Sequence, residues 1–352
     1  MEAKPQEKPM HDVYLPFTEE ELLEHFAPIT GSKADPERHL TYYRRSLKRW
    51  NAYAGPAKVP KGEQRKALSA ALQVEKDERF WVIAALLGAF RDEEGRVERL
   101  SQLLTLALCE SPPITGFDRW EDCLAGPLHL FFEVSLPSPR AYRAWLRENL
   151  DERVLIPHLR EAGQGSKLEG HTHVDAVLIA EDTGCAVVFE AKVLSDADSK
   201  ITYDALRNQI ARNIDVMLDS QTDHPRLGSV LKARKPQNTC FVLLTPEIFR
   251  SNPTSRLYGW LLPEYQNNSK RLGEDLAHRD DVSDWSAVSK RLGWLTFEEC
   301  ESVTQGTCRW LTVTEGAMAS PQGRLPRVTE RASADPLLGS ERQSTRVATD
   351  GV

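Results

Sequence analysis

Two runs of apolar residues, at positions 173–180 and 185–193, flank a polar turn at positions 181–184. Short apolar runs bounded by turn residues are typical of buried β-strands, so this stretch predicts a β-hairpin. Three charged residues interrupt its apolar character: Asp175 in the first run, and Glu190 and Lys192 in the second. A charge inside a buried strand is costly unless it is paired or holds an ion, so these three residues mark a candidate site.

The spacing of these residues decides which face of the hairpin they share. Glu190 and Lys192 are two residues apart and therefore point to the same face of their strand. A symmetric four-residue loop would place Asp175 opposite Glu190, whereas a three-residue loop with a bulge at Gly184 would shift the pairing by one residue. In the first register two carboxylates lie side by side with an ammonium group next to them. That arrangement is typical of a site for a hard divalent cation.

The remaining pattern predicts helices around a small number of strands. Thr18 followed by three Glu residues indicates a helix start, and helical spacing predicts helices over about 138–160, 202–218, 285–292 and 296–303. Residues 239–245 predict a third buried strand. We therefore expect an α/β fold divided into a flexible lead-in at 1–16, a helical N-terminal region at 17–135, a domain that holds the predicted strands at 136–312 and a disordered tail at 313–352.

Composition narrows the class of protein. The 352 residues carry a formal net charge of −7, which argues against a protein that coats nucleic acid non-specifically but allows a local basic cleft. No apolar run is long enough to span a membrane, and the six Cys residues form no CxxC pair. We therefore expect a cytoplasmic protein without a membrane partner. The basic and aromatic run at positions 42–50 fits either a nucleic-acid contact or the outer face of an amphipathic helix.

Residues 138–245 resemble the PD-(D/E)XK nuclease superfamily, the restriction-endonuclease-like enzymes. The resemblance lies in a helix, an Asp at the head of a strand, Glu-x-Lys on the next strand and a following helix that carries Gln. It implies a restriction-endonuclease-like mixed sheet flanked by helices, here with an all-helical N-terminal extension. Asp175 matches the metal-binding Asp of the family, Glu190 its second acid, Lys192 its catalytic Lys and Gln209 its helix Gln. The chain departs from the family pattern at Val174, where Pro is usual.

Further residues are implied around this set. Many members carry a Glu on the helix before the Asp strand, and Glu148 and Glu152 both fit, with Glu152 favoured because it is closer in sequence. Arg207 and Arg212 fit either phosphate contacts or a solvated helix face, and His173 would line the pocket.

The implied activity is metal-dependent hydrolysis of phosphodiester bonds. Asp175 and Glu190 would hold Mg²⁺, with Mn²⁺ as the alternative cation. Nucleic acid would be the substrate, and the analogy with the family favours DNA over RNA. The sequence leaves the oligomeric state open, a homodimer included. Two alternatives stay in view: a catalytically silent nucleic-acid-binding or scaffold protein on the same fold, and a zinc hydrolase that uses His171, His173 and Asp175. The latter His-x-His-x-Asp pattern resembles the start of the metallo-β-lactamase motif, but Ala176 stands where that motif ends in His.

Overall fold

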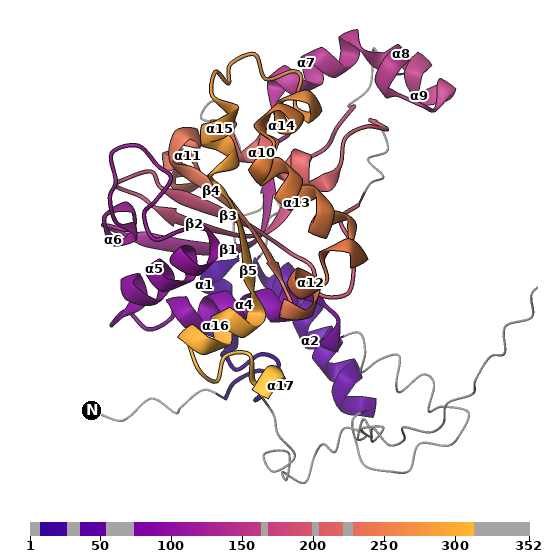
Figure 1. Cartoon of the computed structure of the whole chain (residues 1–352). Helices are drawn as coiled ribbons and strands as arrows, with labels where there is room; N and C mark the ends of the chain where they lie inside the picture. The colour runs from indigo at the N-terminus through magenta and orange to yellow at the C-terminus, as the bar shows by residue number, and fades with distance from the viewer. Residues whose placement is uncertain are drawn as a thin grey trace, which may run out of the picture.

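A five-stranded mixed sheet forms the centre of the molecule (Figure 1). The computed structural model describes residues 8–26, 36–53, 74–162, 168–198, 204–220 and 228–312. Strands β1 to β3 form an antiparallel meander, and β4 and β5 run parallel to β3 in the order β1-β2-β3-β4-β5. The strands are β1 (Leu128–Leu136), β2 (Thr172–Ala180), β3 (Ala186–Ala191), β4 (Thr239–Thr245) and β5 (Leu292–Thr296).

The hairpin of β2 and β3 has the symmetric register. Ala176 pairs with Phe189, and the amide of Ala180 donates to the carbonyl of Cys185 at 2.8 Å, so four residues form the loop. Gly184 supplies the left-handed backbone that this turn needs, with φ of 69°. In the same register Asp175 lies opposite Glu190, one step beyond the last paired residues.

One face of the sheet is covered mainly by N-terminal helices. Helix α4 is buried on nearly every side and contacts β1, β2 and β3, as expected for a helix that is apolar all round. Thr18 begins α1 with a capping box, which confirms the predicted helix start. The helices of this layer are α1 (Glu19–His25), α2 (Pro36–Tyr53), α4 (Glu78–Phe90), α5 (Arg96–Ala107), α6 (Trp120–Cys123), α16 (Phe297–Val303) and α17 (Arg309–Thr312).

The opposite face carries helices from the second half of the chain. Ile214 of α10 packs there with Val177, Val188 and Phe241 of the sheet. The helices of this side are α10 (Gln209–Met217), α11 (Ser229–Ala233), α12 (Glu247–Ser251), α13 (Leu257–Asn267), α14 (Ser269–Asp275) and α15 (Trp285–Ser289), with single turns η1 (Pro236–Asn238) and η2 (Pro253–Ser255). A smaller cluster involves α7 (Arg140–Glu148), α8 (Leu150–Arg153) and α9 (Pro157–Ala162), which lie together at one corner of Figure 1.

The α/β class with a mixed sheet between helices is confirmed, but the N-terminal region is not all helical. Strand β1 begins at Leu128, inside the region expected to be helical, and pairs with β2 along its length. The N-terminal helices therefore form one layer of the same sheet rather than an extension.

Other element boundaries also differ from the prediction. The single helix expected over 138–160 is three short helices, because the chain leaves helical geometry at Asn149 and again at Val154. The helix expected from 202 begins only at Gln209, because Asn208 caps it through its side chain. Strand β5 was missed, and the predicted helix over 285–292 ends at Ser289. The predicted strand over 239–245 is confirmed as β4.

The predicted disordered tail at 313–352 lies outside the described residues, and of the lead-in only residues 8–16 are described. There Tyr14 and Leu15 are buried against the helical layer, so this part is not a loose segment. Within the ranges given above, no helix is long and apolar enough to cross a membrane. All six Cys residues are free thiols, and only Cys109 is exposed.

Candidate active site

Asp175, Glu190 and Lys192 converge where β2 and β3 part. The amide of Ala191 donates to Asp175 Oδ2 at 2.7 Å, which ties the carboxylate of β2 to the end of β3. Glu190 and Lys192 are almost fully buried, and Lys192 Nζ lies 2.6 Å from Glu190 Oε1. The three residues that the sequence singled out therefore form one cluster in the structure.

Helix α10 holds Glu190 with two amide side chains. Gln209 is its first residue and donates to Glu190 Oε1 at 2.6 Å. Asn213, one turn later on the same face, donates to Glu190 Oε2 at 2.9 Å and is fully buried. Gln209 is in turn positioned by the amide of Asp198, which donates to Gln209 Oε1 at 3.0 Å. The predicted Gln thus reaches the acid through α10, and Asn213 is a second contact of the same kind.

A third carboxylate comes from a helix that sequence reasoning did not consider. Glu78 opens α4, and its Oε2 lies 3.7 Å from Lys192 Nζ. Its Oε1 accepts from the amide of Val193 at 3.3 Å and from the hydroxyl of Ser195. The available signal was an acidic residue at the first position of a helix that is apolar from Phe80 onward.

The two acids proposed for this position lie elsewhere. Glu148 ends α7 and Glu152 lies on α8, and both side chains are exposed to solvent. Neither makes a hydrogen bond or ion pair with the cluster within the described part of the chain. The structure therefore places Glu78, and not Glu148 or Glu152, beside Lys192.

Burial and crowding of like charges shift the ionisation of this cluster. Burial, and then the neighbouring carboxylates of Glu190 and Glu78, raise the pKa of Asp175 well above its usual value. Burial alone would lower the pKa of Lys192, but Glu190, Glu78 and Asp175 outweigh it and raise that pKa. Lys192 is therefore a firmly protonated ammonium group among three carboxyl groups.

The donor chemistry of the cluster fits a hard divalent cation. Carboxylate oxygens are the ligands such ions prefer, and a single ammonium group does not neutralise the cluster once Asp175, Glu190 and Glu78 are all ionised. Both oxygens of Glu190 accept hydrogen bonds, from Lys192, Gln209 and Asn213. Within the described ranges, no three His, Cys, Asp or Glu side chains are gathered closely enough to enclose a metal ion.

The predicted arginines belong to a buried network beside the cluster. Arg207 is 1% exposed, stacks on the Tyr142 ring at 3.6 Å and donates to Asp215 Oδ2 at 2.8 Å. Arg212 Nε lies 2.9 Å from Glu169 Oε1, and Arg212 also donates to the carbonyl of His171. Arg207 is thus a core residue rather than a phosphate contact or a solvated side chain, because its charge is balanced inside the protein.

The histidines of the zinc alternative both lie beside Ser135 of β1. Part of the His173 ring is covered by the protein, and this desolvation, followed by the charge of Arg212, lowers its pKa. His171 Nδ1 lies 3.2 Å from the hydroxyl of Ser135 on β1. Among the residues that the structure describes, they form no metal-ligating group with Asp175.

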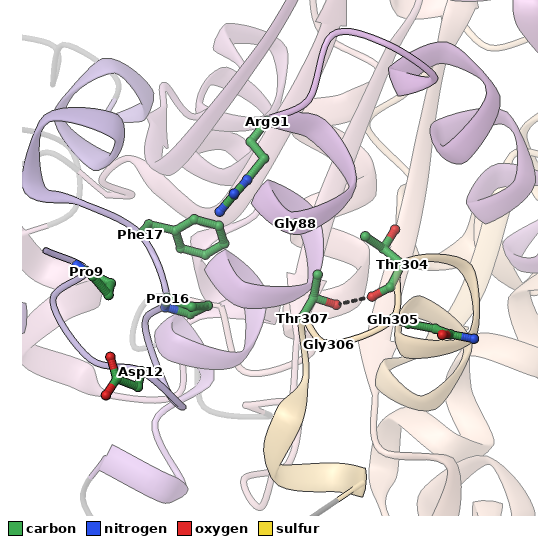
Figure 2. Close-up of a pocket in the computed structure, with 10 residues that line it drawn as sticks. All are labelled: Pro9, Asp12, Pro16, Phe17, Gly88, Arg91, Thr304, Gln305, Gly306 and Thr307. Carbon is green, nitrogen blue, oxygen red and sulfur yellow. Dashed lines mark hydrogen bonds between the residues drawn. The ribbon is translucent and has the colours of Figure 1, made fainter. Parts of the chain in front are cut away.

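A separate pocket of about 430 Å³ lies away from these residues, between the N-terminal segment, α4 and the turn after α16 (Figure 2). Arg91 and Phe17 both line this pocket, and the Arg91 guanidinium lies 5.7 Å from the centre of the Phe17 ring. Its lining residues are Pro9, Asp12, Pro16, Phe17, Gly88, Arg91, Thr304, Gln305, Gly306 and Thr307.

Comparisons of this chain with protein-family models, curated proteins and solved structures found no match.

Proposed function

We propose that this protein is a metal-dependent nuclease that hydrolyses phosphodiester bonds, with DNA as the preferred substrate. The observation that carries the proposal is the hairpin register, which brings Asp175 opposite Glu190 with Lys192 beside both. These residue types in this arrangement suit phosphoryl chemistry, in which charge has to be stabilised at the reacting phosphate.

The order of elements supports the resemblance to PD-(D/E)XK nucleases. A helix with an acidic residue (α4) is followed by the meander β1-β2-β3, by α10 and by β4 parallel to β3. Asp175 lies on the second strand, Glu190 on the third and Gln209 on the helix. Glu78 corresponds in this order to the Glu that many members of the superfamily carry on a helix before the Asp strand.

Asp175 and Glu190 are the proposed metal ligands, because they are the two acids on facing strands. When bound there, Mg²⁺ or Mn²⁺ would polarise the phosphoryl oxygen and lower the pKa of a coordinated water. Gln209 and Asn213 hold Glu190 in place from α10, and their amides restrain the orientation of this acid.

Lys192 is the proposed catalytic cation. Its ammonium group is protonated and fixed between Glu190 and Glu78, so it can orient the attacking water and stabilise negative charge on the phosphate without any change in its own protonation. Glu78 acts through Lys192 and through the backbone of Val193, which makes it a positioning residue for the lysine.

A second candidate is a catalytically silent nucleic-acid-binding protein of the same fold. The observation that favours it is the saturation of Glu190, whose two oxygens are engaged by an ammonium group and two amides. In that case the cluster would serve only to stabilise the end of the hairpin.

One experiment separates the two functions. The purified full chain is incubated with supercoiled plasmid, linear duplex, single-stranded DNA and RNA, each with Mg²⁺, Mn²⁺ or EDTA, beside an Asp175→Asn variant. Cleavage that needs the divalent cation and disappears in the variant supports the nuclease. Binding of nucleic acid without cleavage in any cation supports the silent protein. Stoichiometric zinc in the purified protein would instead favour the zinc hydrolase.

A further inference from the structure

The segment that contains α2 is strongly basic within an acidic protein. Residues 36–76 carry ten Lys and Arg residues against three Glu residues, whereas the whole chain has a formal net charge of −7. Such a local reversal of charge attracts polyanions even when the protein as a whole repels them.

The positive charges of α2 line its outer face. Arg38, Arg45 and Arg49 are seven and four residues apart, which places them on one stripe of the helix. All three are exposed, as is Lys48 beside them. The opposite side of α2 buries Leu40, Tyr43 and Leu47 in the core, so the stripe faces away from the protein.

These four cations differ from their neighbour Arg44. The guanidinium of Arg44 is paired with Glu19 and with Glu37 Oε2, the latter at 2.8 Å. In the part of the chain that the structure describes, Arg38, Arg45, Lys48 and Arg49 take part in no ion pair. Their charge is therefore available to an external partner.

The buried side of α2, opposite the stripe, contacts the strand next to the candidate active site. The Tyr43 hydroxyl of α2 donates to Glu133 of β1 at 3.3 Å, and Glu133 lies opposite Asp175 in the register of β1 and β2. Arg79 follows Glu78 directly, lies 3.1 Å from the same Glu133 carboxylate and stacks over the Tyr42 ring at 4.2 Å. Figure 1 shows α2 starting near α4 and extending below the sheet, away from it.

We propose that the outer face of α2, defined by Arg38, Arg45, Lys48 and Arg49, binds the phosphodiester backbone of nucleic acid and delivers it to the Asp175 cluster. From Arg38 to Arg49 the helix extends about 16 Å, which matches roughly five successive phosphates of one strand. Recognition through the backbone also fits the aromatic residues nearby, because Arg79 covers the Tyr42 ring and so removes it as a stacking platform for bases. The contact would be independent of base sequence. Binding of nucleic acid by α2 does not depend on the proposed nuclease function. Only the delivery of the strand to the Asp175 cluster rests on that function.

The test measures binding without cleavage. Fluorescence anisotropy with a labelled 20-base-pair duplex, a single strand of the same sequence and an acidic polypeptide is recorded in EDTA over a range of salt concentrations. The test variant combines Arg38→Gln, Arg45→Gln, Lys48→Gln and Arg49→Gln. The matched control combines Arg91→Gln, Arg147→Gln, Lys235→Gln and Lys290→Gln, which removes the same number of exposed charges elsewhere. Circular dichroism and thermal melting establish that both variants are folded.

The proposal predicts that the test variant binds duplex about 10- to 1,000-fold more weakly, and that its salt slope falls by roughly three to four, since each lost phosphate contact lowers the slope by about 0.9. The control variant keeps the wild-type slope. Arg45→Gln alone lowers the slope by about one, whereas Arg44→Gln leaves it unchanged because that charge is already paired. Comparable loss on duplex and single strand supports backbone recognition, and loss on only one of them identifies the form that α2 holds.

Equal binding by the test and control variants would overturn the proposal, as would binding of the acidic polypeptide in preference to both nucleic acids. The outcome is separable from the nuclease assignment. If α2 binds nucleic acid but no cation supports cleavage, the proposed function fails and this inference stands.

Discussion

The backbone N–H of Ala191 donates a hydrogen bond to Asp175 Oδ2 across the end of the β2–β3 hairpin, at 2.7 Å. Ala191 is the middle residue of the Glu-x-Lys pattern, so Asp175 is coupled directly to the segment that carries Glu190 and Lys192. A change at Asp175 therefore acts on the ionisation of the cluster and on the geometry of the strand end together, and under the proposed function it would also act on metal binding.

Replacing Asp175 by Asn tests its role as a ligand. Asparagine keeps the shape and can still accept from the Ala191 amide, but it removes the negative charge that a divalent cation needs. We expect Asp175→Asn to abolish cleavage and to weaken Mg²⁺ binding at least ~10-fold. Calorimetric titration and a plasmid cleavage assay measure the two effects. A variant that binds Mg²⁺ like the wild type would remove Asp175 from the ligand set.

The same substitution makes a prediction about stability and pH. The pKa of Asp175 is raised in the folded state by burial and by Glu190 and Glu78, so the folded protein holds this proton more tightly than the unfolded chain. Its contribution to stability is full below the unfolded pKa of about 3.9 and is lost as the pH rises through the folded pKa. Without metal, Asp175→Asn should therefore gain stability over wild type as the pH increases from 4 to 8. Urea unfolding in EDTA at several pH values measures this difference, and a difference that shrinks with pH would contradict it.

Glu78 and Glu152 form a natural pair for comparison. Both are Glu residues in the first turn of a helix, but only Glu78 contacts Lys192 and the backbone of Val193. We expect Glu78→Gln to reduce kcat by roughly 10- to 100-fold, as typically follows loss of a group that orients an active-site residue. Glu152→Gln should cleave like wild type, since its side chain is exposed on α8. Equal activity of both variants would remove Glu78 from the site.

The contrast between Glu78 and Glu152 shows which contacts can be predicted from the sequence and which cannot. Asp175, Glu190 and Lys192 could be predicted because they lie on one hairpin, where strand alternation and loop length determine which residues meet. Gln209 could be predicted because it begins the next helix. Glu78 could not, because its contact with Lys192 joins segments more than a hundred residues apart, and only the packing of α4 onto the sheet creates it.

The arginines show a second limit. Arg207 lies in a polar stretch before a helix, which suggests exposure, but Tyr142 covers it and Asp215 neutralises it. Strands β1 and β5 are not predicted for a related reason, since β1 lies in the region expected to be helical and β5 lies between two predicted helices. Partners that come together only in the tertiary structure leave no local pattern in the chain.

Asp215 should be one of the most important residues for stability. It is fully buried on α10 and accepts from Arg207 at 2.8 Å, from Arg279 at 2.6 Å and from His278 at 3.0 Å. Asp215→Asn would leave buried cations without their counter-charge, at a cost of about 3–5 kcal/mol. Urea unfolding at pH 7 measures this loss, and a loss below about 1 kcal/mol would show that Asp215 contributes no more than an exposed ion pair.

The same residue gives a pH dependence of opposite sign to that of Asp175. Its cationic partners lower the pKa of Asp215 against the effect of burial, so its stabilisation is present above the unfolded pKa of about 3.9 and is lost as the pH falls towards the folded pKa. The stability difference between wild type and Asp215→Asn should therefore narrow in acid. A difference that widens below pH 4 would contradict this assignment.

Lys192 separates catalysis from metal binding. Its ammonium group contacts Glu190 and Glu78 and would not bind a cation, so Lys192→Ala should abolish cleavage while Mg²⁺ remains bound. Binding should become tighter, because the variant removes a positive charge and leaves three carboxylates to attract the ion. Without metal the variant should be less stable, since those carboxylates then repel one another, and added Mg²⁺ should restore much of the loss. Calorimetric titration, melting with and without Mg²⁺ and a cleavage assay test these effects together, with Lys290→Ala as an exposed control. If Lys192→Ala cleaves like wild type, the Glu-x-Lys pattern is ordinary strand sequence and the nuclease proposal fails.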